Sequence, residues 1–232
     1  MNILAVDTSG NVCSAAVLRG EKLLSESYMD DKKTHSETIA PMVDECLARV
    51  GMEVNDIDLF CCAVGPGSFT GLRIGTALIK AFAHASGKPA VGVNTLDALA
   101  ANVSGTSEMV CPMIDARRGE VYTATYRDGE RVSDYRAVPL ESVLSELRGE
   151  SVMFVGDGAM NYREKIVQAS PSFRIAHSGM VLQRASSVGL VGRRMAQNGD
   201  AQDAYTLEPF YLRETQAERV LAQKQREARR EG

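Results

Sequence analysis

A pattern of short strands separated by glycine turns occurs twice in this chain, about half a chain length apart. The first copy contains ILAVD, TSGN and VCSAAVL, and the second contains VCPMID, ARRG and VYTATY. Asp7 and Asp115 end the first strand of each copy and are 108 residues apart, whereas the later turn glycines, Gly20 and Gly129, are 109 residues apart. One inserted residue explains the difference. Similarity at a nearly fixed offset is typical of an internal duplication, so we predict two lobes of the same design.

Helical and apolar strand patterns alternate between and after the two copies. SETIAPMVDECLARVG has apolar residues at helical spacing, and we expect Ser36 to cap this helix. DLFCCAVG is a nearly continuous apolar run that indicates a buried strand. This alternation predicts an α/β fold in which each lobe has a mixed sheet flanked by helices. We assign residues 1–106 to the first lobe, 107–218 to the second and 219–232 to a charged tail. A late helix near residues 186–197 is expected to return toward the first lobe.

The composition excludes several classes of protein. The formal net charge is −4, which disfavours autonomous nucleic-acid binding through a basic face. The cysteine count of five is odd and no pair has C-x-x-C spacing, which indicates reduced thiols. No apolar run reaches the about 18 residues that a membrane span needs, and the first residues do not resemble a signal peptide. We therefore expect a cytoplasmic protein that does not enter a membrane.

A glycine-rich segment, GPGSFTGLRIG, follows the apolar strand and opens a helix. That context favours an anion at the helix N-terminus. The segment nevertheless lacks the Lys-Ser/Thr pair of a P-loop, and Pro66 stands where a nucleophile elbow would need glycine. We therefore predict that Ser68 caps the helix rather than acting as a nucleophile.

The helix after this segment carries two apolar stripes on opposite sides. Ile74, Ala77 and Leu78 belong to one stripe, and a helix that is apolar on two sides is buried on two sides. Glycines four residues apart also allow another backbone to approach. We predict a partner-binding surface from this helix and the preceding one, while a helix wholly inside its own domain is the alternative. The predicted surface comprises Ser36, Ile39, Met42, Val43, Gly67, Gly71, Leu72, Gly75, Thr76, Ile79 and Ala83.

Seven motifs spread over nearly the whole chain resemble one bacterial family. They are ILAVDTS, THSETIAPMVDECL, GPGSFTGLRIG, GVNTLDALA, IDARRGEVY, VGDGA and YLRE. Together they are similar to the TsaB (YeaZ) family of tRNA threonylcarbamoyladenosine biosynthesis subunits. The resemblance implies the duplicated actin-like fold, also called ASKHA or ribonuclease H-like, which agrees with the internal repeat.

The resemblance also implies a non-catalytic role. The catalytic paralogue, TsaD, holds a metal with an H-x-x-x-H pair, and Thr95 and Leu99 occupy those two positions here. Neither side chain supplies an imidazole ligand, so we expect no metal and no enzymatic activity. The family pattern implies a scaffold that pairs with a TsaD-like paralogue, helps to recruit a TsaE-like ATPase and contacts tRNA mainly through the complex. A homodimer is expected when the partner is missing.

A nucleotide site is the open alternative. The residues at the positions of the fold's two phosphate loops are Asp7, Thr8, Ser9, Gly10, Asp115 and Arg117. DTSGN contains no basic residue, so we expect no required cofactor, with ATP or ADP at a partner interface as the remaining option. A small actin-fold kinase or ATPase is the second hypothesis. A metallopeptidase is disfavoured, because the three histidines are dispersed.

Overall fold

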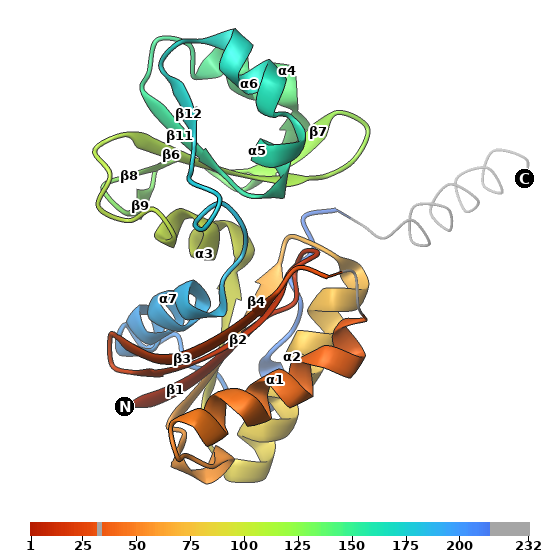
Figure 1. Ribbon diagram of the computed structural model, residues 1–232, viewed down its shortest axis with the longest axis vertical. Helices are drawn as coiled ribbons and strands as arrows, with labels where there is room; N and C mark the ends of the chain where they lie inside the picture. Colours follow the sequence, from red (N-terminus) through yellow and green to blue (C-terminus); the bar gives the residue numbers. More distant parts are fainter. Residues whose placement is uncertain (32–33, 214–232) are drawn as a thin grey trace, which may run out of the picture.

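The structure is a computed structural model that describes residues 1–31 and 34–213. Its described part forms two lobes, each built on one sheet (Figure 1). The first sheet has the order β3-β2-β1-β4-β5. Its strands are β1 (Asn2–Asp7), β2 (Cys13–Arg19), β3 (Lys22–Met29), β4 (Leu59–Gly65) and β5 (Ala90–Asn94).

The second sheet repeats this order with later strands. Its path is β10-β7-β6-β11-β12, so each strand takes the place of its counterpart in the first sheet. Its strands are β6 (Met109–Asp115), β7 (Glu120–Thr123), β8 (Tyr126–Arg127), β9 (Glu130–Arg131), β10 (Arg136–Pro139), β11 (Val152–Val155) and β12 (Phe173–Ile175). The matching strand orders confirm the duplicated fold that the repeat predicts.

The second copy departs from the first at one position. The sequence predicts a single strand from Val121 to Tyr126, but the strand is interrupted between β7 and β8. In the register of this ladder, Pro112 of β6 lies opposite Ala124. Because proline has no backbone N–H, the ladder loses a donor there. The Thr123 hydroxyl instead donates to the Pro112 carbonyl oxygen at 2.7 Å.

Helices cover both faces of the first sheet (Figure 1). Helices α1 (His35–Arg49) and α2 (Phe69–Ser86) pack on one face, where their apolar residues meet Leu4, Val6 and Phe60. Helix α7 (Ala185–Gln197) packs on the opposite face against Ile3 and Ala5. The late helix thus lies on the first sheet, as expected, although the exact lobe boundaries stay a prediction. The short 3-10 turns are η1 (Val54–Asp56) and η2 (Ala204–Thr206).

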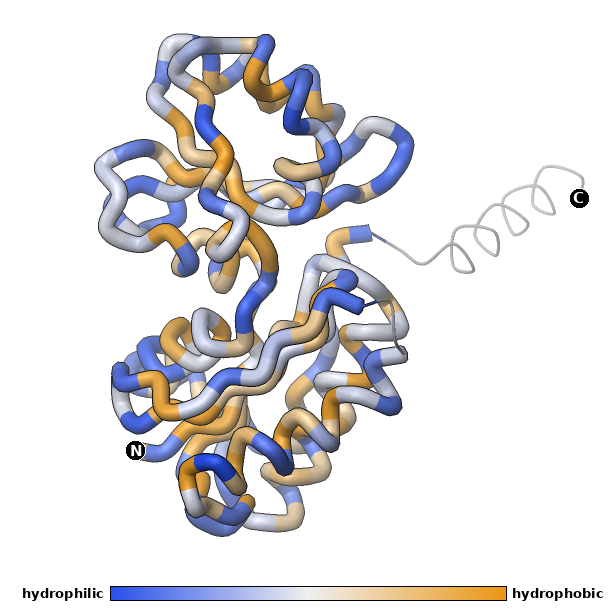
Figure 2. The backbone as a smooth tube through the Cα atoms, in the orientation of Figure 1, coloured by the Kyte–Doolittle hydropathy of each residue, from blue (hydrophilic) through white to orange (hydrophobic). Residues whose placement is uncertain are grey.

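The second sheet is covered in the same way. Helices α4 (Leu140–Glu146), α5 (Asp157–Asn161) and α6 (Arg163–Ala169) bury one face around Phe154. Helix α3 (Thr95–Ala101) packs on the other face through Leu96 and Leu99. Figure 2 shows hydrophobic residues along the central strands of the lobes and hydrophilic residues in many outer turns.

The two capping predictions have different outcomes. Ser68 caps α2, since its hydroxyl accepts a hydrogen bond from the Gly71 amide at 3.2 Å. Ser36 does not cap α1, because the helix already begins at His35, and the residue before it, Thr34, makes no side-chain cap bond. The predicted charged tail, residues 219–232, lies outside the described residues. Among the described residues, none of the helices combines the length and hydrophobicity that crossing a bilayer requires.

Candidate partner surface and phosphate-loop positions

The start of α2 is pressed against the loop that follows β1. A Cβ added to Gly67 would overlap the backbone oxygen of Ser9, and one added to Gly71 would overlap the backbone oxygen of Thr8. A Cβ on Gly75 would overlap the Thr8 hydroxyl. The four-residue spacing of these glycines therefore serves a close contact inside the first lobe.

Hydrogen bonds hold this contact in place. The Thr8 hydroxyl donates to the Gly71 carbonyl oxygen at 2.7 Å, and the Ser68 amide donates to the Ser9 carbonyl oxygen at 2.7 Å. Thr8 and Ser9 are buried. The loop and the helix consequently satisfy each other's polar groups, as a buried backbone requires.

This contact corrects the predicted partner surface. The residues of that prediction that turn out to be buried are Ile39, Met42, Val43, Gly71, Leu72, Gly75, Thr76, Ile79 and Ala83. Gly67 is half-buried, and Ser36 alone of the predicted set is exposed. The chosen stripe faces the sheet of its own lobe because the glycines on that side fit the β1 loop. It therefore offers no surface to a partner.

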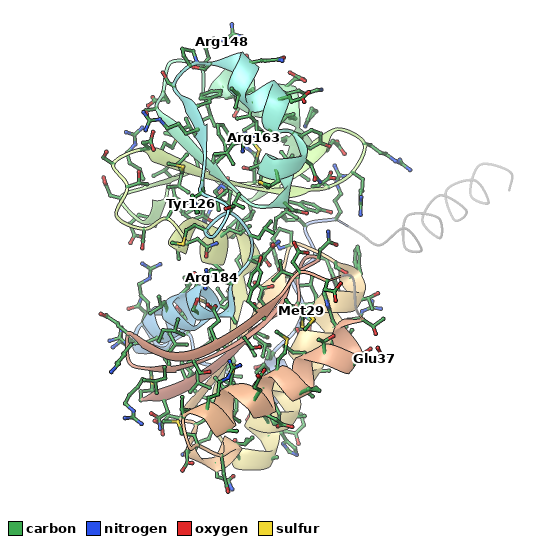
Figure 3. All side chains as sticks on the ribbon, in the orientation of Figure 1. Met29, Glu37, Tyr126, Arg148, Arg163 and Arg184 are labelled. Atoms are coloured by element: carbon green, nitrogen blue, oxygen red, sulfur yellow. The ribbon has the colours of Figure 1, made fainter. Side chains whose placement is uncertain are left out.

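The other stripe of α2 points outward. We call it the outer α2 face: Ile74, Ala77, Leu78, Ala81 and Ala85. The three alanines are exposed, while Ile74 and Leu78 are half-buried against α2's own lobe. Helix α1 lies beside α2, and Figure 3 shows the Glu37 label at the outer side of α1. The outer α2 face is therefore an apolar helical surface that stays accessible.

The end of the described chain runs along α2. The Tyr211 ring stacks on Phe69 at a centroid distance of 4.7 Å, and Arg73 donates to the Tyr211 hydroxyl at 3.2 Å. The Lys80 ammonium donates to the Tyr205 carbonyl oxygen at 3.2 Å. Tyr211 thus anchors the end of the described chain, and this segment covers the flank of α2 rather than the outer α2 face.

Asp7, at the position of the first phosphate loop, is buried within its own lobe. Its Oδ1 accepts hydrogen bonds from the Ser9 amide at 2.8 Å and the Ser9 hydroxyl at 2.6 Å, while its Oδ2 has no partner among the described residues. Burial raises the pKa of Asp7 to about 6, and the Ser9 bonds and the charge of nearby His35 oppose that shift. The ring of His35 bonds the Gly10 carbonyl oxygen through Nε2 at 2.8 Å.

Asp115, at the second phosphate-loop position, accepts hydrogen bonds to both carboxylate oxygens within its own lobe. It accepts hydrogen bonds from the Arg117 amide at 2.8 Å, Asn161 Nδ2 at 3.1 Å and the Tyr162 hydroxyl at 3.3 Å. Arg117 is exposed. Within the described residues, no hydrogen bond or ion pair joins the two predicted halves of the nucleotide site, so that site stays a prediction.

The two positions that correspond to the metal-binding histidines lie in the core. Thr95 and Leu99 are both 0% exposed. Residues 1–31 and 34–213 contain no group of three or more histidine, cysteine, aspartate or glutamate side chains placed to hold a metal ion. All five cysteines are buried free thiols.

Sequence reasoning missed a polar junction between α3 and the second sheet. The hydroxyls of Tyr126 and Tyr135 both donate to the Asp97 carboxylate, at 2.5 and 2.7 Å. They line a pocket of about 400 Å³ that Arg131 and Arg194 also border. No local pattern could have revealed this junction, because the three residues are far apart in the chain.

Comparison with known proteins agrees with this architecture. The family model TsaD, described as tRNA N6-adenosine threonylcarbamoyltransferase, matches residues 22–220. The tRNA threonylcarbamoyladenosine biosynthesis protein TsaB of Bacillus subtilis is 34% identical over 226 residues, covering 94% of this chain and 96% of the relative. The protein of the same name from Escherichia coli is 31% identical, covering 97% of this chain and 100% of the relative.

Two solved structures are similar to this fold. YeaZ from Pseudomonas aeruginosa has a TM-score of 0.78 at 29% identity, covering 91% of this chain and 99% of the other. The ROK hexokinase of Thermus thermophilus has a TM-score of 0.53 at 12% identity, covering 86% of this chain and 100% of the other. The latter similarity concerns the actin-like fold alone.

The glycine contact predicts a large effect of a single methyl group. Gly71→Ala should lower the free energy of unfolding by about 3 kcal/mol, since Cβ has to displace the Thr8 backbone. In a chain of this size that corresponds to a melting temperature roughly 6–12 °C lower. Gly179→Ala is the matched control, because its Cβ would lie 3.6 Å from the nearest atom, in ordinary contact. Equal melting temperatures for the two variants would contradict the contact.

The raised pKa of Asp7 predicts that the stability of the fold depends on pH. Its folded-state pKa of about 6 lies above the ordinary 3.8, so the folded chain binds more protons than the unfolded chain between these values. This contribution to stability is present below pH 4 and is lost as the pH rises to about 6. Asp7→Asn removes the ionisation. The free energy of unfolding of the variant, measured relative to that of the parent, should therefore rise by about 2 kcal/mol from pH 4.5 to pH 7.5. Urea unfolding at both pH values measures this gain, and the exposed Asp200→Asn serves as control. A pH-independent difference between Asp7→Asn and the parent would refute it.

Proposed function

Because the chain belongs to the TsaB (YeaZ) family of tRNA threonylcarbamoyladenosine biosynthesis proteins, we propose that it is the non-catalytic subunit of the transfer complex. In this proposal it binds a TsaD-like catalytic paralogue, and the pair recruits a TsaE-like ATPase. The complex works in the cytoplasm, and tRNA is held mainly by the partners.

One observation carries the proposal: the outer α2 face is apolar and accessible. In a soluble protein, a surface helix whose inner side packs on the core normally has polar residues on its outer side. Here the outward stripe consists of Ile74, Ala77, Leu78, Ala81 and Ala85, and the three alanines are exposed. Small side chains let a second helix approach closely, and apolar area withdrawn from water favours association.

The inner contacts support α2 as a rigid docking element. Thr8 and Ser9 hold the N-terminal turns of the helix, and Tyr211 and Tyr205 hold its flank. A partner that docks on a helix fixed in this way loses little conformational entropy on binding. The same surface can pair two copies of the chain when the partner is missing, which is our proposal for the isolated protein.

The buried Thr95 and Leu99 support the non-catalytic part of the proposal. A hydroxyl and an isobutyl group replace the two imidazoles that the catalytic paralogue uses, and both lie in the core at 0% exposure. The reactive metal in this proposal therefore belongs to the partner. In this proposal, ATP or ADP that contacts the chain binds at the partner interface, and the close packing of the β1 loop against α2 supports this assignment.

A charge on the outer α2 face tests the proposal directly. Ala81→Glu should weaken pairing with the TsaD-like protein of the same genome by about 2 kcal/mol or more, roughly thirtyfold, because a buried unpaired carboxylate is costly at an interface. Titration calorimetry with the two purified proteins measures the affinity. Val167→Glu on α6 is the matched control, as it places the same charge on an exposed position (52%) of the second lobe.

Three results decide the matter. The proposal expects loss of pairing for Ala81→Glu with an unchanged melting temperature, and normal pairing for Val167→Glu. Equal loss for both variants would show that the surface is wrong. No pairing of the parent protein, with and without ATP and the TsaE-like ATPase, would refute the subunit role itself.

A further inference from the structure

The turn between β6 and β7 places two arginines in a backbone conformation that side chains rarely adopt. Arg117 has φ 68° and Arg118 has φ 57°, and Gly119 follows with φ 78°. Within the described chain, Asp128 is the other non-glycine residue with positive φ. Asparagine, aspartate and glycine are the usual occupants of such positions, so two consecutive arginines cost stability here. Retained strain of this kind points to a role for the side chains.

Both arginines carry charge that no described residue neutralises. Arg117 and Arg118 are exposed, and neither forms an ion pair with another described residue. The acidic neighbours of the turn are engaged elsewhere. Glu120 pairs with Arg213, and Asp115 accepts three hydrogen bonds at the base of the turn. Two positive charges therefore project from the tip of the hairpin.

The location of the turn favours a large ligand. Figure 1 shows the hairpin beside label β7 projecting from the second lobe, and Figure 2 shows its tip in the colours of hydrophilic residues. Three backbone donors of the turn are used internally: Arg117 N bonds Asp115, Glu120 N bonds the Arg117 oxygen, and Ala116 N bonds the Glu120 oxygen. A phosphate cradle needs such amides free. The guanidinium groups on a projecting tip instead suit an extended polyanion.

We propose that Arg117 and Arg118 form a contact for the sugar-phosphate backbone of an RNA. Guanidinium groups bind phosphate oxygens in a fork geometry, and backbone contacts position an RNA without reading its sequence. The inference rests on the proposed function for the kind of RNA, since the relatives' names refer to tRNA. It assigns to this chain a direct, local contact with RNA, despite the overall charge of −4.

Salt-dependent binding tests the contact. The parent chain and R117N/R118N are each combined with the TsaD-like partner, and binding of a fluorescent tRNA transcript is followed by anisotropy from 50 to 200 mM KCl. Two lost phosphate contacts should make the slope of log K against log salt about 1.5 less steep, and the affinity at 50 mM should fall by on the order of tenfold. R117K/R118K keeps both charges and should retain most of the slope.

Controls separate this effect from charge and folding. R148Q/R194Q removes two exposed arginines elsewhere and changes the net charge equally, so tRNA affinity should stay within about twofold of the parent. Figure 3 shows Arg148 at the end of the second lobe farthest from the first. Because asparagine tolerates positive φ, R117N/R118N should melt at or above the temperature of the parent.

Each alternative outcome overturns the inference. An unchanged salt slope for R117N/R118N excludes a phosphate contact. Weakened binding of the TsaD-like protein at unchanged tRNA affinity assigns the arginines to a protein interface, and weakened binding of Mg-ATP in calorimetry assigns them to a nucleotide. If the parent forms no complex, the proposed function fails, and the RNA contact is then judged on the isolated chain at 50 mM KCl by the same comparison of variants.

Discussion

The close contact between three glycines of α2 and the Thr8–Ser9 loop determines much of this structure. Because Gly67, Gly71 and Gly75 have no side chains, the helix lies directly on the loop, and the Thr8 hydroxyl reaches the Gly71 carbonyl oxygen. This contact selects which side of α2 faces the sheet. It also packs the loop at the predicted first phosphate position directly against the helix.

The selected orientation gives α2 two distinct surfaces. Its inner side joins the core of the first lobe, and its outer side leaves a stripe of alanines and partly buried aliphatic residues open. In the second lobe, the corresponding turn after β6 leaves Arg117 and Arg118 exposed. Duplication therefore produced two similar loops, of which one is packed inside the protein and the other projects from it.

The sequence predicted the duplicated fold, because turn glycines and strand-ending aspartates recur at a constant offset. It also predicted the buried β4 strand and the Ser68 cap, both of which depend on local residues. It could not select the inner side of α2, since both stripes are apolar and the loop that fits the glycines lies some sixty residues earlier in the chain. The glycines on the same stripe as Leu72 and Ile79 did indicate a close backbone contact. We interpreted that contact as a partner helix, whereas the glycines pack against the Thr8–Ser9 loop of the same lobe. Two further features also depend on residues distant in the chain. They are the hydrogen bonds of Tyr126 and Tyr135 to Asp97 and the interruption between β7 and β8 opposite Pro112.

In the proposed complex, α2 binds its partner with the outer face and its own lobe with the inner face. NMR spectra of the chain with labelled alanine methyl groups, recorded with and without the TsaD-like protein, measure both faces at once. We predict that the methyl signals of Ala77 and Ala81 shift or broaden on complex formation, whereas the signal of Ala83, buried at 1% exposure, stays in place. A response confined to Ala83, or unchanged signals at Ala77 and Ala81 in a formed complex, would contradict it.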